Sequence, residues 1–463
     1  MLILAGAIAG ASCQHVERAP IDAAANGQRI AARSLANPAV QELLARHQLA
    51  VTEGQSWSLD QLTLAAWALR TDLVVARAEV AAARAATGVD GQRPNPTVAS
   101  TNEKAVDANA PDPWVVGAAL AFTLETGDKR AIRRERALAN ERALEWRFGE
   151  ALWAARAEVR AALLDLALAQ ERLALDDEET KLARAFLAWV DTRFEVGAAT
   201  TSERLAAVLA VNESSSRRGL DAAALTAAAA TLATTIGVLP DEIANLRPIL
   251  PPLATLPALG AAEVGAARDL ALVNRLDVRR ALAEYDIAEE DLRAAVASQY
   301  PDLTLAPGYM VDRGEHKITL GLDLPVPLFH NADAAIREAI AARAVAAAKF
   351  DDVQAAVLAG IGVGFARYES SREALAAAEQ TERDAAGVAG SLERRLAAGG
   401  ANRGELLAGQ ITLARLRRTT LDARLALLDA VTALENSTER PLYPASSIEA
   451  AGSIRELLVG AQQ

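Results

Sequence analysis

The chain has 463 residues and a formal net charge of −12, and it contains no basic stripe that could displace the counterions of nucleic acid. Nucleic acid is therefore excluded as a partner. Apolar residues make up 51% of the chain but aromatic residues only 4%, and the surplus is alanine and leucine. This composition favours long helices packed through small side chains over a thick aromatic core.

The N-terminus has the layout of an export signal. An apolar run from Leu2 to Ala11 leads into small residues directly before Cys13. This pattern predicts a signal peptide at 1–12, with Cys13 acylated as the first residue of a lipid-anchored segment, 13–57. The alternative is an ordinary signal cleaved nearby, with Cys13 as a free thiol. Gly10 stands where Leu is usual and no Lys or Arg precedes the run, so both readings stay open. With one cysteine, no internal disulfide can form.

The rest of the chain contains an internal repeat. Asp72-Leu73 and Asp277-Val278 match at an offset of 205 (277 − 72), and each is followed by a proline, Pro96 or Pro301. The offset falls to 202 (395 − 193) where Arg193–Gly197 matches Arg395–Gly399. We therefore expect two structural repeats at 58–256 and 257–440, followed by a tail at 441–463.

Each repeat is expected to contain a helix, two strands, a very long helix, a turn and a further long helix. No proline occurs between Pro113 and Pro240 or between Pro327 and Pro441, so neither stretch is broken by a helix-breaking residue. Residues 131–192 would span about 90 Å as one helix. A coiled coil explains this stretch alone equally well. The uncharged run Ala222–Pro240 is interpreted as a packed helix rather than a membrane span, because it is mostly Ala and Thr.

The strands are predicted from alternation of apolar and polar residues. Trp114–Glu125, Leu303–Val311 and Lys317–Phe329 alternate with a period of two, and the region near Pro96–Val106 does so weakly. Four strands cannot close a membrane barrel, and open edges are not tolerated in lipid, so the barrel must be shared between chains. The alternation predicts that the apolar residues face lipid: Val116, Leu120, Leu322 and Leu324. The residues predicted to face the lumen are Thr319, Gly321 and Asp323. Aromatic rings at the strand ends are predicted to lie at the membrane interface: Trp114, Tyr300 and Phe329. Core packing of these rings is the alternative.

These segments together resemble the TolC-type outer-membrane factor family. The resemblance is carried by Leu59-Asp60-Gln61-Leu62, Asn274–Val278, Tyr300–Leu303, Gly321–Phe329 and the two Arg-x-x-x-Gly segments, and it runs from about Leu59 to Leu434. It implies a mainly α fold with membrane β structure. A homotrimer would close a 12-stranded barrel in the outer membrane of a Gram-negative bacterium, continued by a periplasmic α-helical barrel.

The resemblance also implies partners and cargo. A periplasmic adaptor protein would join the channel to an inner-membrane transporter of the proton-driven resistance-nodulation-division type. The run Gly127-Asp128-Lys129-Arg130 is similar to the Gly-Gly-Lys-Arg run of the heavy-metal efflux branch, which points to metal cations as cargo, although Asp128 departs from that pattern.

Two groups of residues are candidates for function. The first group would form the turns that dock the adaptor: Arg193, Val196, Gly197, Arg395, Gly399 and Gly400. The second group would form carboxylate rings at a closed aperture: Glu382, Asp384 and Glu393. The alternatives are that the glycines only make turns and that the carboxylates are solvated surface charge.

Catalytic and cofactor chemistry is not expected. The four histidines lack metal-ligand spacing, and no phosphate-binding or nucleophile motif appears. Gly360, Gly362 and Gly364 are interpreted as positions of close helix packing. The acidic runs Asp176–Glu179 and Asp351-Asp352 are interpreted as solvated helix faces rather than cation sites. Two functions remain: an export channel, or a periplasmic coiled-coil scaffold in which the hairpins only cap helices.

Overall fold

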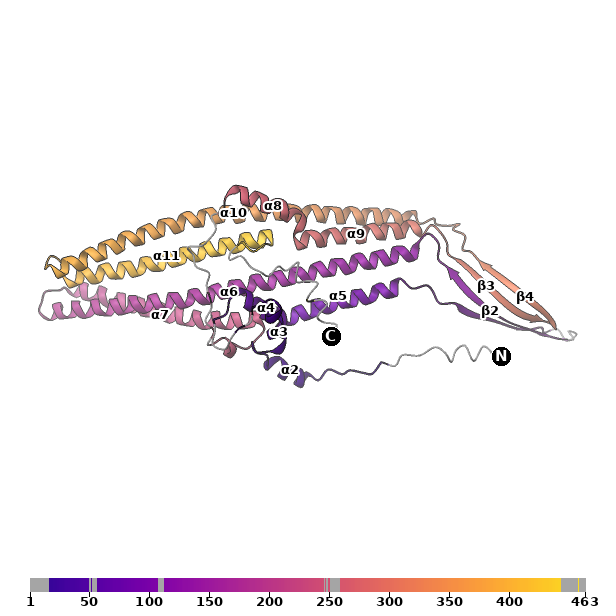
Figure 1. Cartoon of the computed structure of the whole chain (residues 1–463), viewed down its shortest axis with the longest axis horizontal. Coiled ribbons are helices and arrows are strands. Elements are labelled where there is room, and N and C mark those ends of the chain that lie inside the picture. The colour runs from indigo at the N-terminus through magenta and orange to yellow at the C-terminus, as the bar shows by residue number, and fades with distance from the viewer. Residues whose placement is uncertain are drawn as a thin grey trace.

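The molecule is a long rod with strands at one end and helical turns at the other (Figure 1). The computed structural model describes residues 16–49, 51, 56–106, 112–244, 246, 249, 259–442 and 457. Cys13 and the expected signal peptide lie outside the described residues.

The two repeats have the same order of elements. The first contains α5 (Thr71–Asp90), β1 (Thr97–Lys104), β2 (Trp114–Leu124), α6 (Lys129–Glu195) and α7 (Thr201–Ile236). The second contains α9 (Leu276–Ala297), β3 (Leu303–Asp312), β4 (Glu315–Asp323), α10 (Asp333–Ala397) and α11 (Arg403–Thr438). Outside this pattern lie α2 (Ala23–Ala31), α3 (Pro38–Arg46), α4 (Leu59–Leu69), the short η1 (Pro240–Glu242) and α8 (Ala261–Asn274). The predicted order of elements is confirmed in both repeats.

The long helices follow from the proline-free stretches. α6 has 67 residues and α10 has 65, so each is about 100 Å long at 1.5 Å per residue. The return helices begin at side-chain caps, with a capping box of Thr200 and Glu203 at α7 and Asn402 at α11. Their first turns are therefore set by local sequence.

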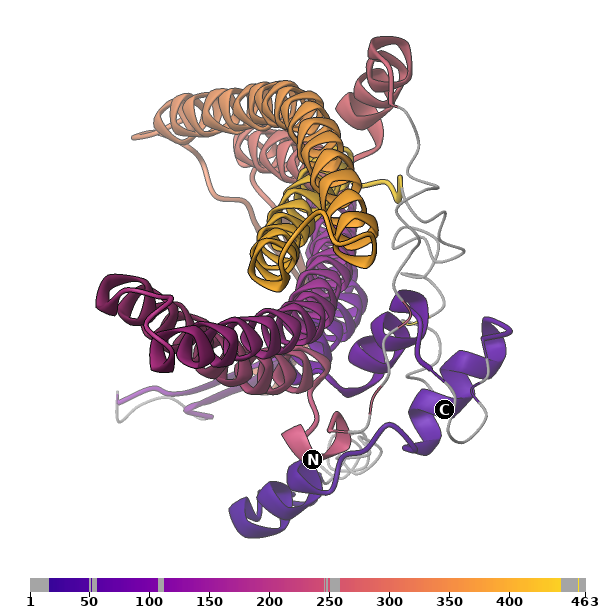
Figure 2. The same ribbon diagram turned by 90° about the vertical axis from the view of Figure 1, so that its left-hand side faces the viewer.

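The helices form a curved wall along the rod (Figures 1 and 2). Toward the turns the order across the wall is α7, α6, α11, α10, and toward the strands it is α5, α6, α9, α10. The contacts α6–α7, α6–α11, α10–α11, α5–α6, α6–α9 and α9–α10 hold this order. The outer flanks of the wall are thus α7 or α5 on one side and α10 on the other.

The largest apolar core lies near the middle of the rod. There α3 and α4 pack against α6 and the end of α7, burying residues such as Leu62, Leu152 and Ile236. Trp67 is buried with them and donates a hydrogen bond from Nε1 to the carbonyl of Leu152 at 2.9 Å. This core attaches the N-terminal helices to the long wall.

By length and composition, α7 is the one helix among the described residues that could cross a membrane, which alone is weak evidence for a span. It contains most of the Ala222–Pro240 run. It returns antiparallel along α6 and ends at Gly237, which has φ +91° and contacts the end of α4. The structure therefore places this run in the helical wall.

The four strands form one antiparallel sheet in the order β1-β2-β3-β4. Cross-strand partners repeat the expected alternation: Phe122 pairs with Leu305, which pairs with Leu322 on the same face. β4 is shorter than predicted, because it ends at Asp323 instead of continuing to Phe329. Pro325 and Pro327 lack the N–H that a ladder requires, so the residues after Asp323 leave the sheet.

Candidate channel wall and docking tips

The sheet has one strongly apolar face, and it is exposed in the single chain. Ile318, Leu320 and Leu322 on β4 are 90%, 72% and 65% exposed, and Val116 and Leu120 on β2 are also exposed. Thr319 and Gly321 alternate with these residues and so lie on the opposite face. A water-exposed sheet would not keep such a face uncovered, so this face requires an apolar surrounding.

The expected division of residues between the two faces is seen on β2 and within β4, whereas some predicted positions lie outside the strands. Leu324, predicted as a lipid-facing strand residue, lies just beyond the end of β4, and Phe329 lies six residues beyond it. Trp114 is the first residue of β2, as expected, and Tyr300 lies three residues before the start of β3. The Lys104 ammonium lies 5.3 Å from the centre of the Trp114 ring. On β1, Ser100 and Asn102 share the apolar face of β2 through their partners, which explains the weak sequence signal there.

The Gly127–Arg130 run joins the sheet to the helices. Gly127 and Asp128 both have positive φ, +63° and +57°, and turn the chain from β2 into α6. The Lys129 ammonium donates to Asp302 Oδ1 at 2.7 Å, and Arg130 Nε donates to the carbonyl of Gly91 at 2.8 Å. This run therefore ties β2 to the start of β3 and to the end of α5.

The two Arg-x-x-x-Gly turns lie at the end of the rod farthest from the sheet (Figure 1). We call them tip 1 (Arg193–Thr200) and tip 2 (Arg395–Asn402). Gly197 and Gly399 have φ +71° and +76°, a conformation that favours glycine. In both tips the arginine closes the turn, because Arg193 Nη2 donates to the carbonyl of Ala198 at 2.6 Å and Arg395 Nη2 to that of Gly400 at 2.9 Å. Sequence reasoning missed this hydrogen bond.

The helices next to the two tips contact each other through an aromatic ring. Trp189, one turn before tip 1, lies against Gly404 at the start of α11, where a Cβ would overlap the indole ring. The Arg193 guanidinium lies 4.7 Å from the centre of the same ring. Val196 at the apex of tip 1 is 77% exposed. The tips thus form one paired surface with an exposed apolar apex.

The three candidate aperture residues do not share one side of α10. Glu382 and Glu393 are 11 residues apart, which brings them to nearly the same face, whereas Asp384 lies about 180° around the helix from Glu393. Glu382 reaches Arg417 of α11 at 3.8 Å, and Asp384 accepts a hydrogen bond from Gln380 at 2.9 Å. A single ring containing all three carboxylates is therefore not compatible with the structure.

The acidic run Asp176–Glu179 is only partly the solvated face that the sequence suggested, because Asp177 and Glu178 are exposed and the other two carboxylates are buried. Asp176 and Glu179 are only 1% and 3% exposed. Each carboxylate of the run meets an arginine: Asp176 with Arg418, Asp177 with Arg218, Glu178 with Arg417, and Glu179 with Arg217 and Arg415. These arginines come from α7 and α11, which the linear sequence does not show to be neighbours. Asp351-Asp352 is exposed, as expected.

The glycine run on α10 fits the expected close packing at two of its three positions. A Cβ at Gly364 would lie 3.4 Å from Leu434 Cα of α11, and one at Gly360 would lie 3.4 Å from Ser437 Oγ. Gly362 has nothing within 4 Å. Gly360 and Gly364 share a helix face, and that face packs against α11.

Each repeat also carries an Arg-x-Asp clamp that sequence reasoning did not identify. Arg70 and Arg275 both hold the aspartate two residues later with two hydrogen bonds of 2.7–3.0 Å. Arg275 also donates to the carbonyls of Asn436 and Ser437 at the end of α11. The signal was present in the sequence, because the 205-residue offset relates these two arginines.

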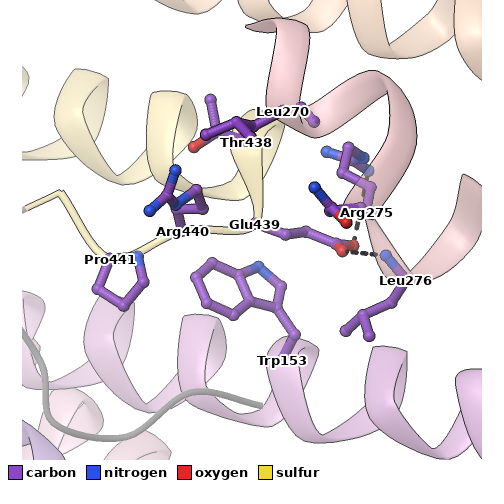
Figure 3. A pocket seen from close by; sticks show the side chains of 10 residues that line it. Trp153, Leu270, Arg275, Leu276, Thr438, Glu439, Arg440 and Pro441 are labelled. Atoms are coloured by element: carbon purple, nitrogen blue, oxygen red, sulfur yellow. Dashed lines mark hydrogen bonds and ion pairs between the residues drawn. The ribbon is translucent and has the colours of Figure 1, made fainter. Parts of the chain in front are cut away.

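Glu439 completes the second clamp at the edge of a cavity of about 280 Å³ (Figure 3). Its carboxylate accepts a hydrogen bond from the amide of Leu276 at 2.6 Å and so caps the start of α9. Burial raises the pKa of the Glu439 carboxyl to about 7, although Arg275 and the Leu276 amide act in the opposite direction. Glu439 has φ +48°, where the first repeat has Gly237.

No group of three or more metal-ligating side chains occurs in the part of the chain that the structure describes. The described features are those of a transport protein: a sheet with an apolar outer face, a long helical wall, and paired tips.

The comparison with known families agrees with this class. The family model described as "Outer membrane efflux protein" matches residues 63–238 and 267–438, and the chain belongs to this family. The two matched segments fall in the two repeats. The chain is therefore a protein of the outer-membrane efflux channel class, and channels of this family are transport proteins rather than enzymes. No curated protein matched the chain.

Solved structures show the same fold at low sequence identity. The outer-membrane channel OprN is 20% identical with a TM-score of 0.69, covering 82% of this chain and 89% of its own. VceC from Vibrio cholerae is 18% identical with a TM-score of 0.67, covering 82% and 95%. CmeC from Campylobacter jejuni is 14% identical with a TM-score of 0.66, covering 96% and 97%. These similarities establish the TolC-like fold.

Proposed function

We propose that the protein is the outer-membrane channel subunit of a tripartite efflux system. The observation that carries the proposal is the four-stranded sheet, whose edge strands β1 and β4 have no further strand partner among the described residues and whose apolar face is exposed. Three copies would supply 12 strands and close these edges. Substrate would pass through the barrel and the helical tunnel to the outside.

In this proposal the two ends of the rod contact different partners. Tip 1 and tip 2 would dock the hairpins of a periplasmic adaptor, through Val196 and the backbone of the glycine turns. The adaptor would join the channel to an inner-membrane transporter of the resistance-nodulation-division type. Acylated Cys13 would anchor the chain to the outer membrane beside the barrel.

Metal cations are the cargo that the Gly127–Arg130 run favours. Lys129 and Arg130 make hydrogen bonds at the junction of sheet and helices. The run therefore supports this cargo through its similarity to the heavy-metal efflux branch, and not through contact with the cargo. At the tip end, Glu382 and Glu393 would repeat in each protomer and favour cations at a closed aperture. Asp384 would belong to a different face.

Retention in the outer membrane separates the channel from a periplasmic scaffold. After high-salt washing and enzymatic removal of the lipid anchor, the channel stays with the membrane and needs detergent, and the purified protein conducts ions in planar bilayers. A scaffold enters the soluble fraction and gives no conductance. Crosslinking in cells followed by purification then identifies the adaptor and the transporter, and with them the cargo.

A further inference from the structure

The helix that precedes the Arg-x-Asp clamp packs differently in the two repeats. In the first repeat this helix is α4, in which eight of the 11 residues are buried. In the second repeat it is α8, where Ala271 is the one buried residue in the described chain. Figure 2 shows α8 on the convex side of the wall. The cavity of about 280 Å³ lies between α8, the end of α11 and α6, so α8 covers the wall less closely than α4 does.

Two buried tryptophans differ in their hydrogen bonding. Trp67 donates from Nε1 to the carbonyl of Leu152. Trp153 is 6% exposed and lines the cavity, and its Nε1 has no hydrogen-bond partner among the described residues. Figure 3 shows this nitrogen on the side of the ring that faces Glu439. Because an indole N–H can only donate and is costly to leave unpaired when buried, an acceptor bound in the cavity would stabilise the site.

We propose that this cavity binds a small monocarboxylate with an apolar body, which holds α8 against the wall. The carboxylate accepts a hydrogen bond from Trp153 Nε1 and pairs with Arg440, and the apolar body packs on Leu270, Ala271 and Pro441, which line the cavity. The site lies within one chain and does not rest on the proposed channel. In that channel the convex side of the wall faces the periplasm, so the ligand is distinct from the cargo.

The charges around the cavity favour an anion. Arg440 is exposed at the cavity and forms no ion pair with the described residues. The guanidinium of buried Arg156 lies 5.2 Å from the centre of the Trp153 ring. Its Nη1 is 3.6 Å from Glu435, while its Nε and Nη2 have no hydrogen-bond partner among the described residues. Two carbonyls at the end of α11, which would repel an anion, already accept hydrogen bonds from Arg275.

Glu439 makes this binding dependent on pH. Its Oε2 accepts the hydrogen bond from the amide of Leu276, and its Oε1 lies 3.7 Å from Arg275. The charged groups around it are Arg275 and Asp277 of α9, Glu150 of α6 and, at the cavity, Arg440. Burial raises the pKa of this carboxyl to about 7. The protonated carboxyl can donate to the ligand, whereas the ionised form repels it, so binding should strengthen as pH falls through 7.

Calorimetric titration of the full-length protein in detergent tests the site with sodium hexanoate as the probe. We expect saturable binding of one hexanoate per chain. The affinity should be about tenfold higher at pH 6 than at pH 8, since a group with a pKa of about 7 is mostly protonated at the first and mostly ionised at the second. Hexanamide has the same body without the charge and should bind about tenfold more weakly at pH 6.

Four substitutions separate the parts of the site. Trp153→Phe removes the N–H and should weaken hexanoate binding about tenfold. Trp67→Phe is the matched control, because it removes an internal hydrogen bond outside the cavity and should leave hexanoate affinity unchanged. Arg440→Gln should weaken binding about threefold, as expected for an exposed ion pair. Glu439→Gln keeps a donor and an acceptor, so it should bind equally at pH 6 and pH 8.

Three results would overturn the inference. Heats that do not saturate for wild-type protein at pH 6, or that are the same for Trp153→Phe, would show that the cavity holds only water. Equal affinity for hexanamide would show that the site does not select a carboxylate. If Trp153→Phe fails to fold, hexanamide and the exposed Arg440→Gln still decide the question. Conductance in planar bilayers is measured separately, so failure of this site leaves the proposed channel standing.

Discussion

At the scale of single residues, the tips show what a repeated motif can and cannot reveal. The glycines could be predicted from sequence, because Gly197 and Gly399 end long helical runs and adopt positive φ. The hydrogen bonds of Arg193 and Arg395 to turn carbonyls could not, since they depend on the side chain folding back over its own turn. An arginine expected only to contact a partner therefore also supports the turn.

This double role changes the substitutions that test docking. Arg193→Glu should lower the free energy of unfolding by about 1 kcal/mol, because it removes the hydrogen bond to Ala198, and should also weaken adaptor binding. Val196→Ser should leave stability unchanged, because this side chain is 77% exposed, and should weaken adaptor binding alone. Thermal unfolding and adaptor pull-down measure the two effects. Unchanged adaptor binding by Val196→Ser would show that tip 1 is only a turn.

Glu439 gives the clamp of the second repeat a pH dependence. Its folded pKa of about 7 lies above the ordinary value of 4.5, so the folded state binds more protons than the unfolded state between these values. Stability contributed by this group is thus present at low pH and is lost as pH rises toward 7. The melting temperature of Glu439→Gln minus that of wild type should increase as pH rises from 5 to 8. A difference that shrinks with rising pH would show that the ionised carboxylate is net stabilising.

At the scale of elements, the helices were more predictable than the strands. Two proline-free stretches and the caps at Thr200 and Asn402 fix the long helices from local sequence alone. β4 was predicted too long, because its alternation continues through Pro325 and Pro327, where the ladder cannot. β1 was hard to find, because Ser100 and Asn102 interrupt its apolar face. Alternation predicts which face of the sheet a side chain lies on, but it does not predict where the backbone hydrogen bonds of the strand end.

The two faces of β4 provide a direct test of the barrel. Leu322 lies on the apolar face and Thr319 on the opposite one, three residues away on the same strand. Leu322→Arg should destabilise the protein in membranes by about 2–4 kcal/mol near the bilayer midplane, whereas Thr319→Arg should cost much less. Urea unfolding in vesicles measures both. Equal tolerance of Arg at the two positions would contradict a lipid-facing sheet.

At the scale of the whole molecule, the duplication was the most informative signal in the sequence. It predicted both hairpins and both tips, and it relates the Arg70 and Arg275 clamps. It could not show that Asp176–Glu179 meets arginines of α7 and α11, because the pairing of helices across repeats is set by tertiary packing. Asp176 and Glu179, interpreted from the sequence as part of a solvated face, are therefore buried structural residues, whereas Asp351-Asp352 is exposed as predicted.

The number of strands in the single chain constrains the number of copies in the assembly. Four strands per chain give eight strands for two copies and 12 for three. An eight-stranded barrel is filled by its own side chains or holds one small ligand, so two copies would leave no passage for export. Three copies give a wider lumen. Light scattering of the detergent-solubilised protein, corrected for detergent, should therefore give three times the mass of one chain. A particle of two chains would contradict an open channel even if the sheet lies in the membrane.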